Sequence, residues 1–340
     1  MTARVGRLFF SLALVCVCFA GFLWWATHIS PGSVMIAPED SITRVAEKMR
    51  DAGIIRSSFF VRGYIKIFMP SAKIFPGVIV IPRACGWVCA VNVMMNADAN
   101  HARITFPEGD DLRDIKRRFA AIDVVAANTL FSITGRPAYT ARSGSVSRDV
   151  TLSQTFLFLK AVPPDISFEG YLFPDTYVYD AGQGARGLVT MMLRAFDAKI
   201  MKPFRADIVA SGHSLHEIVT VASLLEKEVK SFEDRAMVAD IIWRRFAVGM
   251  PLQLDASVQY VVNGSGRFTT SAERAIDSPW NTYKYRSLPV GPISNPGVDS
   301  VRAALHPVAN GYWYYLTGPD GAVHYARTLD EHALNKKFLK

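Results

Sequence analysis

Two acidic side chains, Glu226 and Glu228, stand two residues apart in a segment with a helical pattern, residues 214–231. Ser214 and Glu217 have the spacing of a capping box, which predicts that a helix begins there. At about 100° per residue, the two glutamates fall on opposite flanks of the apolar stripe, about 80° to either side. A carboxyl group beside an apolar surface can work as a general acid and base, so both are candidates for that chemistry.

The neighbours one helical turn back distinguish the two glutamates. Ala222 and Ser223 precede Glu226 and would leave room for a ligand, whereas two leucines precede Glu228 and would crowd it. The sequence therefore favours Glu226 as the acid, with Lys227 turned away by about 100° round the helix. The alternative is that both glutamates are solvated charges on the flanks of an ordinary helix.

The helix belongs to a basic chain of 340 residues with a net charge of +8, half of whose residues are apolar. A chain of this length can form one large domain or two smaller ones with real cores. Its charge suits anionic partners such as phospholipid headgroups or an acidic cell-wall polymer. We find no basic run with interleaved aromatic residues, so we expect no nucleic-acid partner.

Residues 8–27 contain no charged side chain and follow Arg4 and Arg7. Twenty helical residues span about 30 Å, the thickness of the bilayer's hydrocarbon core. The arginines favour an N-terminus inside the cytoplasm. We therefore expect a cytoplasmic tail at 1–7, one transmembrane helix at 8–27 and an extracytoplasmic remainder. A cleaved signal peptide and a lipoprotein signal are the alternatives, and neither finds a convincing cleavage site.

Residues 28–103 are typical of a small α+β module. The pattern predicts strand, helix, helix and strand, at residues 34–36, from residue 42, at 58–68 and at 79–81. The module is similar in outline to a LysM unit, which implies glycan binding; a plain spacer is the alternative. Cys85 and Cys89 also lie here, and the sequence leaves open whether they form a disulfide or only pack together.

Residues 104–340 predict a larger α+β domain, in which helices alternate with loops rich in Gly, Pro, Trp, Tyr and Asn. Residues 222–228, followed by Arg235, resemble the catalytic helix of the MltG/YceG-like endolytic murein transglycosylases. Further motifs in the order of that family stand at 169–177, 249–255, 278–283, 288–297 and 324–332. The chain departs from the family pattern at Gly77–Ile79, Ala256, Trp280, Val290 and Ala333.

The resemblance implies that Glu226 is the single catalytic acid/base of a lyase acting on peptidoglycan. It would protonate the oxygen between MurNAc and GlcNAc, then take the proton of the muramyl 6-hydroxyl and leave a 1,6-anhydro-MurNAc end. The reaction requires no cofactor and no metal, and the spacing of His324 and His332 fits no standard zinc pattern. A hydrolase, in contrast, needs a second group to activate water or attack the sugar.

The resemblance also implies a substrate cleft and an envelope location. We expect six side chains to line the cleft or support its loops: Glu169, Asp175, Gln253, Asp255, Asn281 and Tyr283. We expect Asp175 and Asp255 to be mainly structural, because they lie next to turn residues. The expected partners are glycan strands, the bacterial inner membrane and peptidoglycan synthases, with the large domain in the periplasm. A non-catalytic scaffold that holds glycan is the alternative function.

Overall fold

The computed structural model describes residues 28–36, 39–69, 77–82, 85–95, 101–137, 148–180, 183–264 and 269–339. The expected transmembrane segment, 8–27, lies outside these residues, and none of the helices within them is long and apolar enough to span a bilayer. Helices and strands are mixed throughout, so the α+β class is confirmed.

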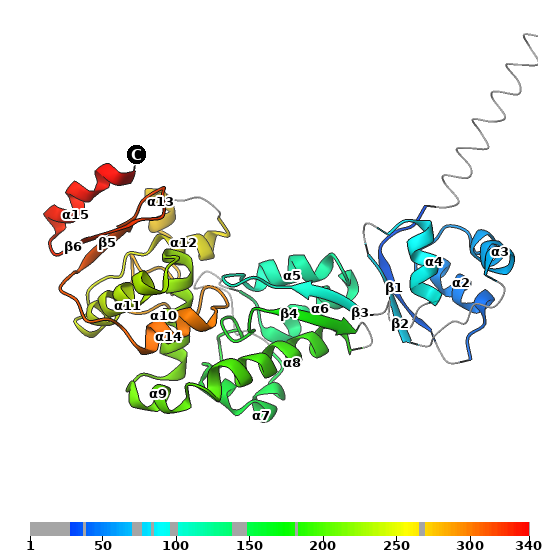
Figure 1. The fold of residues 1–340 in the computed structure, drawn as a ribbon, viewed down its shortest axis with the longest axis horizontal. Coiled ribbons are helices and arrows are strands. Elements are labelled where there is room, and N and C mark those ends of the chain that lie inside the picture. The colour runs from blue at the N-terminus through cyan, green and yellow to red at the C-terminus, as the bar shows by residue number, and fades with distance from the viewer. Residues whose placement is uncertain are drawn as a thin grey trace, which may run out of the picture. The chain divides into compact units, whose positions relative to one another are not determined.

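The described residues form two compact units. Figure 1 labels their helices and strands. The first contains the chain up to Ile104 together with residues 117–128 and 178–184, and the second contains the rest. The domain boundary at residue 104 stays a prediction.

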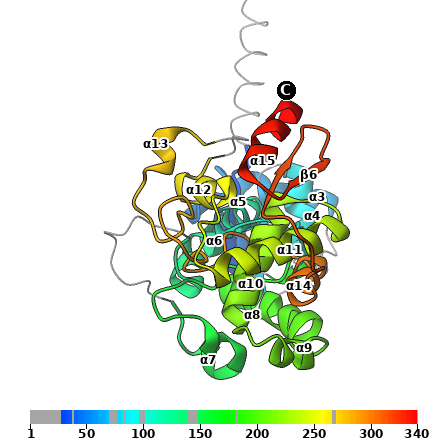
Figure 2. The same cartoon turned by 90° about the vertical axis from the view of Figure 1, so that its left-hand side faces the viewer.

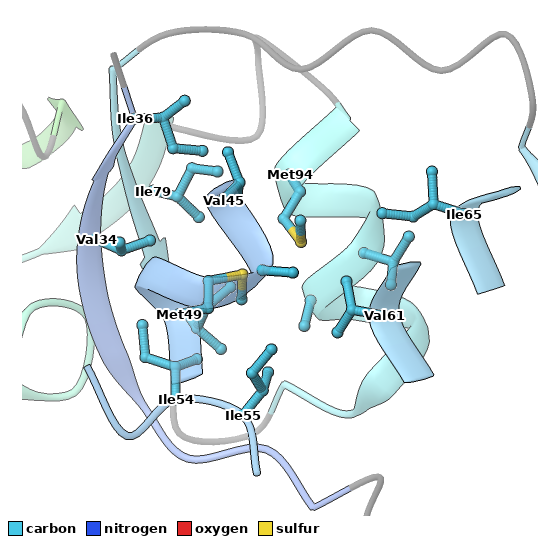
Figure 3. Packing of buried hydrophobic residues seen from close by; sticks show 14 of the residues in the cluster. Val34, Ile36, Val45, Met49, Ile54, Ile55, Val61, Ile65, Ile79 and Met94 are labelled. Carbon is cyan, nitrogen blue, oxygen red and sulfur yellow. The ribbon is translucent and has the colours of Figure 1, made fainter. Parts of the chain in front are cut away.

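In the first unit, strand β1 (Gly32–Ile36) pairs antiparallel with β2 (Gly77–Ile81), so that Val34 lies opposite Ile79. Helices α2 (Ile42–Asp51), α3 (Ser58–Phe68) and α4 (Trp87–Met95) complete the module. Apolar side chains from the sheet meet Val45 and Met49 of α2 in a common core (Figure 3). The predicted strands and first two helices are confirmed, and Cys85 and Cys89 form a disulfide at the start of α4.

Two further sheets have two strands each, β3 (His101–Thr105) with β4 (Thr176–Asp180), and β5 (Tyr314–Thr317) antiparallel to β6 (Val323–Ala326). The other helices are α5 (Leu112–Ala120), α6 (Val124–Thr134), α7 (Leu152–Thr155), η2 (Leu157–Ala161), α8 (Gly184–Phe196), η4 (Asp197–Met201), α9 (Arg205–Ala210), α10 (Leu215–Glu228), α11 (Phe232–Ala247), α12 (Asp255–Val262), α13 (Ser271–Arg274), α14 (Val298–Leu305), α15 (Leu329–Asn335) and η5 (Lys336–Leu339).

Helix α10 is the central helix of the second unit and packs against α11 and α14 (Figure 2). It begins with the predicted capping box, because the Ser214 hydroxyl accepts the Glu217 amide while the Glu217 carboxylate accepts the amide of Ser214. The sequence predicted one apolar stripe, but α10 is buried on nearly every side from Ile218 to Leu225. A helix that is buried on all sides is apolar on all sides. Glu226 and Glu228 accordingly lie in the last turn of α10, after its buried part.

Candidate functional site

The carboxylate of Glu226 is held by partners on two other helices. Its Oε1 accepts a hydrogen bond from Nη2 of Arg235 on α11 at 2.7 Å. Its Oε2 accepts the backbone N–H of Gly297 at 3.0 Å and the hydroxyl of Ser300 at 2.8 Å, both at the start of α14. Only 5% of the Glu226 side chain and 10% of the Arg235 side chain are exposed. The carboxylate therefore joins the ends of three helices.

This placement is electrostatically favourable because the N-terminal end of a helix carries unpaired N–H groups and a partial positive charge. Gly297 also accommodates a second carboxyl group, since a Cβ at this position would come within 1.9 Å of Oε1 of Glu108. Burial, and then the nearby charge of Glu226, raise the pKa of Glu108. Lys227 points elsewhere, because its ammonium donates to the carbonyl of Gly109 at 3.1 Å.

The space expected beside Glu226 is occupied by a loop from far along the chain. The hydroxyl of Ser223 accepts the backbone N–H of Ile293 at 3.0 Å, and the carbonyl of Ser223 accepts the hydroxyl of Ser294 at 3.2 Å. Small residues on α10 thus make room for protein backbone, so their size is no evidence for a ligand at Glu226.

Glu228 faces a different group of residues. The hydroxyl of Tyr315, on β5, donates to its Oε2 at 3.3 Å. Burial of the carboxyl group, followed by the negative charge of Asp255, raises the pKa of Glu228 to about 7, while the hydrogen bonds from Tyr315 and the Ala256 amide oppose that rise. Glu226 and Glu228 are both partly exposed as whole residues, whereas the carboxyl group of Glu228 is buried. A carboxyl group that holds its proton up to near neutral pH is a candidate general acid.

Asp255 and Tyr283, two of the expected cleft residues, are in direct contact. The Tyr283 hydroxyl donates to Oδ1 of Asp255 at 2.7 Å, and Thr269 and Arg274 also donate to that oxygen. The Arg274 guanidinium also lies over the Tyr283 ring, 4.7 Å from its centre. The charge of Asp255 acts on Glu228, so these residues form one cluster, which we call the Glu228 cluster.

Gln253 precedes this cluster and has an unusual backbone. Its φ is +53°, in the left-handed region that a residue other than glycine seldom adopts. Its N–H donates to the carbonyl of Thr282 at 3.2 Å, which fixes the loop, and its side chain is exposed. Strain of this kind is often found at functional sites, so Gln253 is a candidate contact for a ligand.

Glu169 is buried within the protein, 1% exposed. Its carboxylate accepts the Leu112 amide at 3.0 Å, the Tyr260 hydroxyl at 3.0 Å and the Asn295 side-chain amide at 2.9 Å. Burial raises the pKa of Glu169 to about 8, against the effect of the hydrogen bonds from Leu112 and Tyr260. With its oxygens occupied and almost no surface, Glu169 supports loops and does not present a group to a ligand.

Asn281 and Asp175 also bind other parts of the chain. Buried Asn281 donates to the carbonyls of Arg274 and Ile276, and its Oδ1 accepts the Tyr283 amide at 3.0 Å, so it orients Tyr283. Asp175 is exposed and pairs with Lys199 at 2.8 Å, and this hydrogen bond is the first cause of its lowered pKa.

Two motifs that the sequence showed 120 or more residues apart are in contact. Oδ1 of Asn295 accepts the backbone N–H groups of Gly170 at 2.9 Å and Leu172 at 3.0 Å. Gly170 has a φ of +87°, and a Cβ there would lie 2.6 Å from Pro292. This loop pairing positions Ile293 and its neighbours against α10.

Sequence reasoning did not find Tyr315, Ser300 or Gly297 as partners of the two glutamates. Nothing in their local pattern indicates a contact with residues 71 to 87 positions away. The two terminal histidines stack on aromatic rings, His324 on Phe338 and His332 on Tyr314. In the described part of the chain, no group of three or more His, Cys, Asp and Glu side chains could hold a metal ion.

Comparisons with known proteins agree on one family. The model of the YceG-like family matches residues 34–337. An endolytic murein transglycosylase of Bacillus subtilis (strain 168) is 35% identical over 165 residues, 48% of this chain and 46% of that protein. One from Streptococcus pneumoniae serotype 2 (strain D39 / NCTC 7466) is 32% identical over 173 residues, 49% of this chain and 31% of that protein. The chain thus spans less than half the length of these relatives.

A solved structure resembles more of the chain. The crystal structure of a YceG-like protein from Listeria monocytogenes has a TM-score of 0.60 and 27% sequence identity, over 90% of this chain and 99% of that one.

Proposed function

Since the chain belongs to the YceG-like family, we propose that it is an endolytic murein transglycosylase, a lyase that cuts the MurNAc–GlcNAc bond of peptidoglycan. The observation that carries this proposal is the Glu228 carboxyl beside Tyr315 and Asp255, whose pKa is raised to about 7 by its burial. The curated relatives have the same activity in their names, which supports the reaction class.

We propose Glu228, in place of the Glu226 favoured by sequence alone, as the acid/base. The oxygens of Glu226 already accept three hydrogen bonds from the protein itself, one of them from a buried arginine. Glu228 has one side-chain donor, Tyr315, and a desolvated carboxyl group. In this proposal the role of Glu226 is structural, because its hydrogen bonds connect α10 with α11 and α14.

In the proposed reaction, protonated Glu228 gives its proton to the glycosidic oxygen as the bond from that oxygen to C1 of MurNAc breaks. The resulting carboxylate then takes the proton of the muramyl C6 hydroxyl as that oxygen bonds to C1. Glu228 ends in its starting protonation state and no water is consumed. Positive charge at C1 would be stabilised by the carboxylate of Asp255, while Gln253 and Tyr283 would contact the sugar.

We further propose that residues 8–27 anchor the chain once in the bacterial inner membrane, with 1–7 in the cytoplasm and the described units outside. The Cys85–Cys89 disulfide supports an oxidising compartment. Glycan binding by the LysM-like module at 28–103 and association with peptidoglycan synthases belong to the same proposal.

The full chain, in detergent, is incubated with purified sacculi, and the products are identified by mass spectrometry. The wild type should release muropeptides with 1,6-anhydro ends, Glu228→Gln should release almost none, and Glu226→Gln should keep its activity per folded molecule. Activity in Glu228→Gln equal to that of wild type would overturn the assignment. Products with reducing ends would indicate a hydrolase, and no product from wild type would favour the glycan-holding scaffold.

A further inference from the structure

Helix α3 of the first unit has one face in the core and a second, apolar face outside it. Val61 and Ile65 are about 1% exposed and turn into the core (Figure 3). In contrast, Phe59, Ile67 and Phe68 are 69%, 71% and 68% exposed. Phe59 and Ile67 lie about 80° apart round the helix and form one exposed apolar face, whereas Phe68 lies about 180° from Phe59. Large apolar side chains with so much surface in water indicate an interaction site.

The charges of α3 indicate what kind of partner would cover this face. At about 100° per residue, Phe59 and Ile67 lie within one stripe, and Arg62 and Lys66 lie along its flank. The helix contains no acidic residue. Apolar side chains beside basic ones on a single helix are typical of helices that lie in the interface of an anionic membrane.

The path of the chain connects this helix with the proposed anchor. Ile29 forms a β-bridge with Ile55, and the N–H of Ser30 donates to the carbonyl of Ile54 at 2.8 Å. Ile29 lies two residues after the apolar segment 8–27, and its partner Ile55 lies three residues before α3 begins at Ser58. The bridge therefore connects the end of that segment with the start of α3. Two extended residues reach at most about 7 Å, so the first unit starts close to the end of that segment.

We propose that α3 lies on the bilayer surface, with Phe59 and Ile67 at the boundary of headgroups and acyl chains. Arg62 and Lys66 contact the phosphates of anionic lipids. The unit would then be attached to the membrane by two elements, the anchor and α3. The inference rests on the proposed anchor at 8–27, and it is independent of the lytic reaction.

The test uses the full chain reconstituted in vesicles that contain phosphatidylglycerol. In a Cys16→Ala/Cys18→Ala background, an environment-sensitive fluorophore is attached through Phe59→Cys or Ile67→Cys. The matched control is Arg44→Cys on α2, where the side chain is 65% exposed in the same unit. Fluorescence is compared in vesicles with and without lipids brominated near the headgroup.

We expect the emission at positions 59 and 67 to shift to the blue and to be lost in brominated vesicles, with neither change at position 44. Arg62→Gln/Lys66→Gln should reduce the loss. Equal fluorescence at positions 59 and 44 in vesicles would overturn the inference. A blue shift at position 59 that appears with sacculi and not with lipid vesicles would also overturn it and would assign the face to glycan. Flotation separates the failures, since a chain that floats with vesicles but is not quenched keeps its anchor and loses only the α3 contact.

Discussion

Glu226 and Glu228 occupy the same helical turn of α10, yet their carboxyl groups have opposite surroundings. Glu226 meets a buried arginine and the N-terminal end of α14. Glu228 meets a tyrosine hydroxyl and the negative charge of Asp255. Burial, followed by the charge of Asp255, raises the pKa of Glu228 to about 7. This difference supports dividing the roles of the two glutamates into structure and chemistry.

Loss of the Glu226 charge should mainly affect stability. Glu226→Gln leaves the guanidinium of Arg235 without its counter-ion at 10% exposure, and breaking a buried pair from one side typically costs about 3–5 kcal/mol. Urea denaturation of the wild type and the variant measures this loss in the free energy of unfolding. In Glu226→Gln/Arg235→Met, the loss should be smaller than the sum of the two single losses; a simple sum would contradict the direct pairing.

Glu228→Gln should have the opposite profile. The pKa of Glu228 is raised in the folded chain, so the folded state loses stability as the pH rises from about 4 towards 7, and a neutral glutamine avoids that loss. At pH 8 the variant should be at least as stable as wild type, while its rate of anhydromuropeptide release falls by about 10²–10⁴-fold. A variant that unfolds more easily at pH 8 would show that the carboxyl group stabilises the fold.

The pH dependence of kcat/KM should follow the protonation of Glu228. Because only protonated Glu228 can donate, kcat/KM should decline above about pH 7. Asp255→Asn removes a charge that raises the pKa of Glu228, so the decline should begin at lower pH. Tyr315→Phe removes a hydrogen bond that lowers this pKa, so the decline should begin at higher pH. Initial rates on soluble glycan chains from pH 5 to about 9 test both signs. Shifts in the same direction would contradict this account.

Replacing Gln253 tests whether its side chain, on a strained backbone, binds the sugar. Gln253→Gly removes the steric cost of a φ of +53°, so its stability should stay within about 1 kcal/mol of the wild-type value. Its activity should nevertheless fall, with most of the effect in KM, if the side chain binds the sugar. The matched control is Asn263→Gly, at a φ of +52° at the end of α12, which should keep full activity. Equal activity in both variants would remove Gln253 from the site.

Gly170 should be the more sensitive of two glycines with positive φ. Gly170→Ala adds both backbone strain and a Cβ 2.6 Å from Pro292, whereas Gly184→Ala, at a φ of +58°, meets nothing within 4 Å. Thermal unfolding should show a loss of about 1 kcal/mol for Gly184→Ala and of at least about 2–3 kcal/mol for Gly170→Ala. Equal losses would mean that the loop of Pro292 moves freely away from Gly170.

Local signals were enough to predict much of this protein. The capping box of Ser214 and Glu217 marked the start of α10, because capping depends on residues three positions apart. Short apolar runs and helical apolar spacing likewise predicted β1, β2, α2 and α3 of the first unit. The motifs of the larger domain, taken in order, indicated the family that the match over residues 34–337 then showed.

The tertiary structure decided the surroundings of each glutamate. Within α10, Ala222 and Ser223 suggested free space, but Ile293 and Ser294, about 70 residues further on, occupy that side of the helix. Arg235 and Gly297 donate hydrogen bonds to the carboxyl group of Glu226, and Tyr315 contacts Glu228 from a strand 87 residues away. The pKa of a carboxyl group depends on burial and on charges within a few ångströms. Those neighbours come from distant parts of the chain, so no spacing along α10 could have identified them.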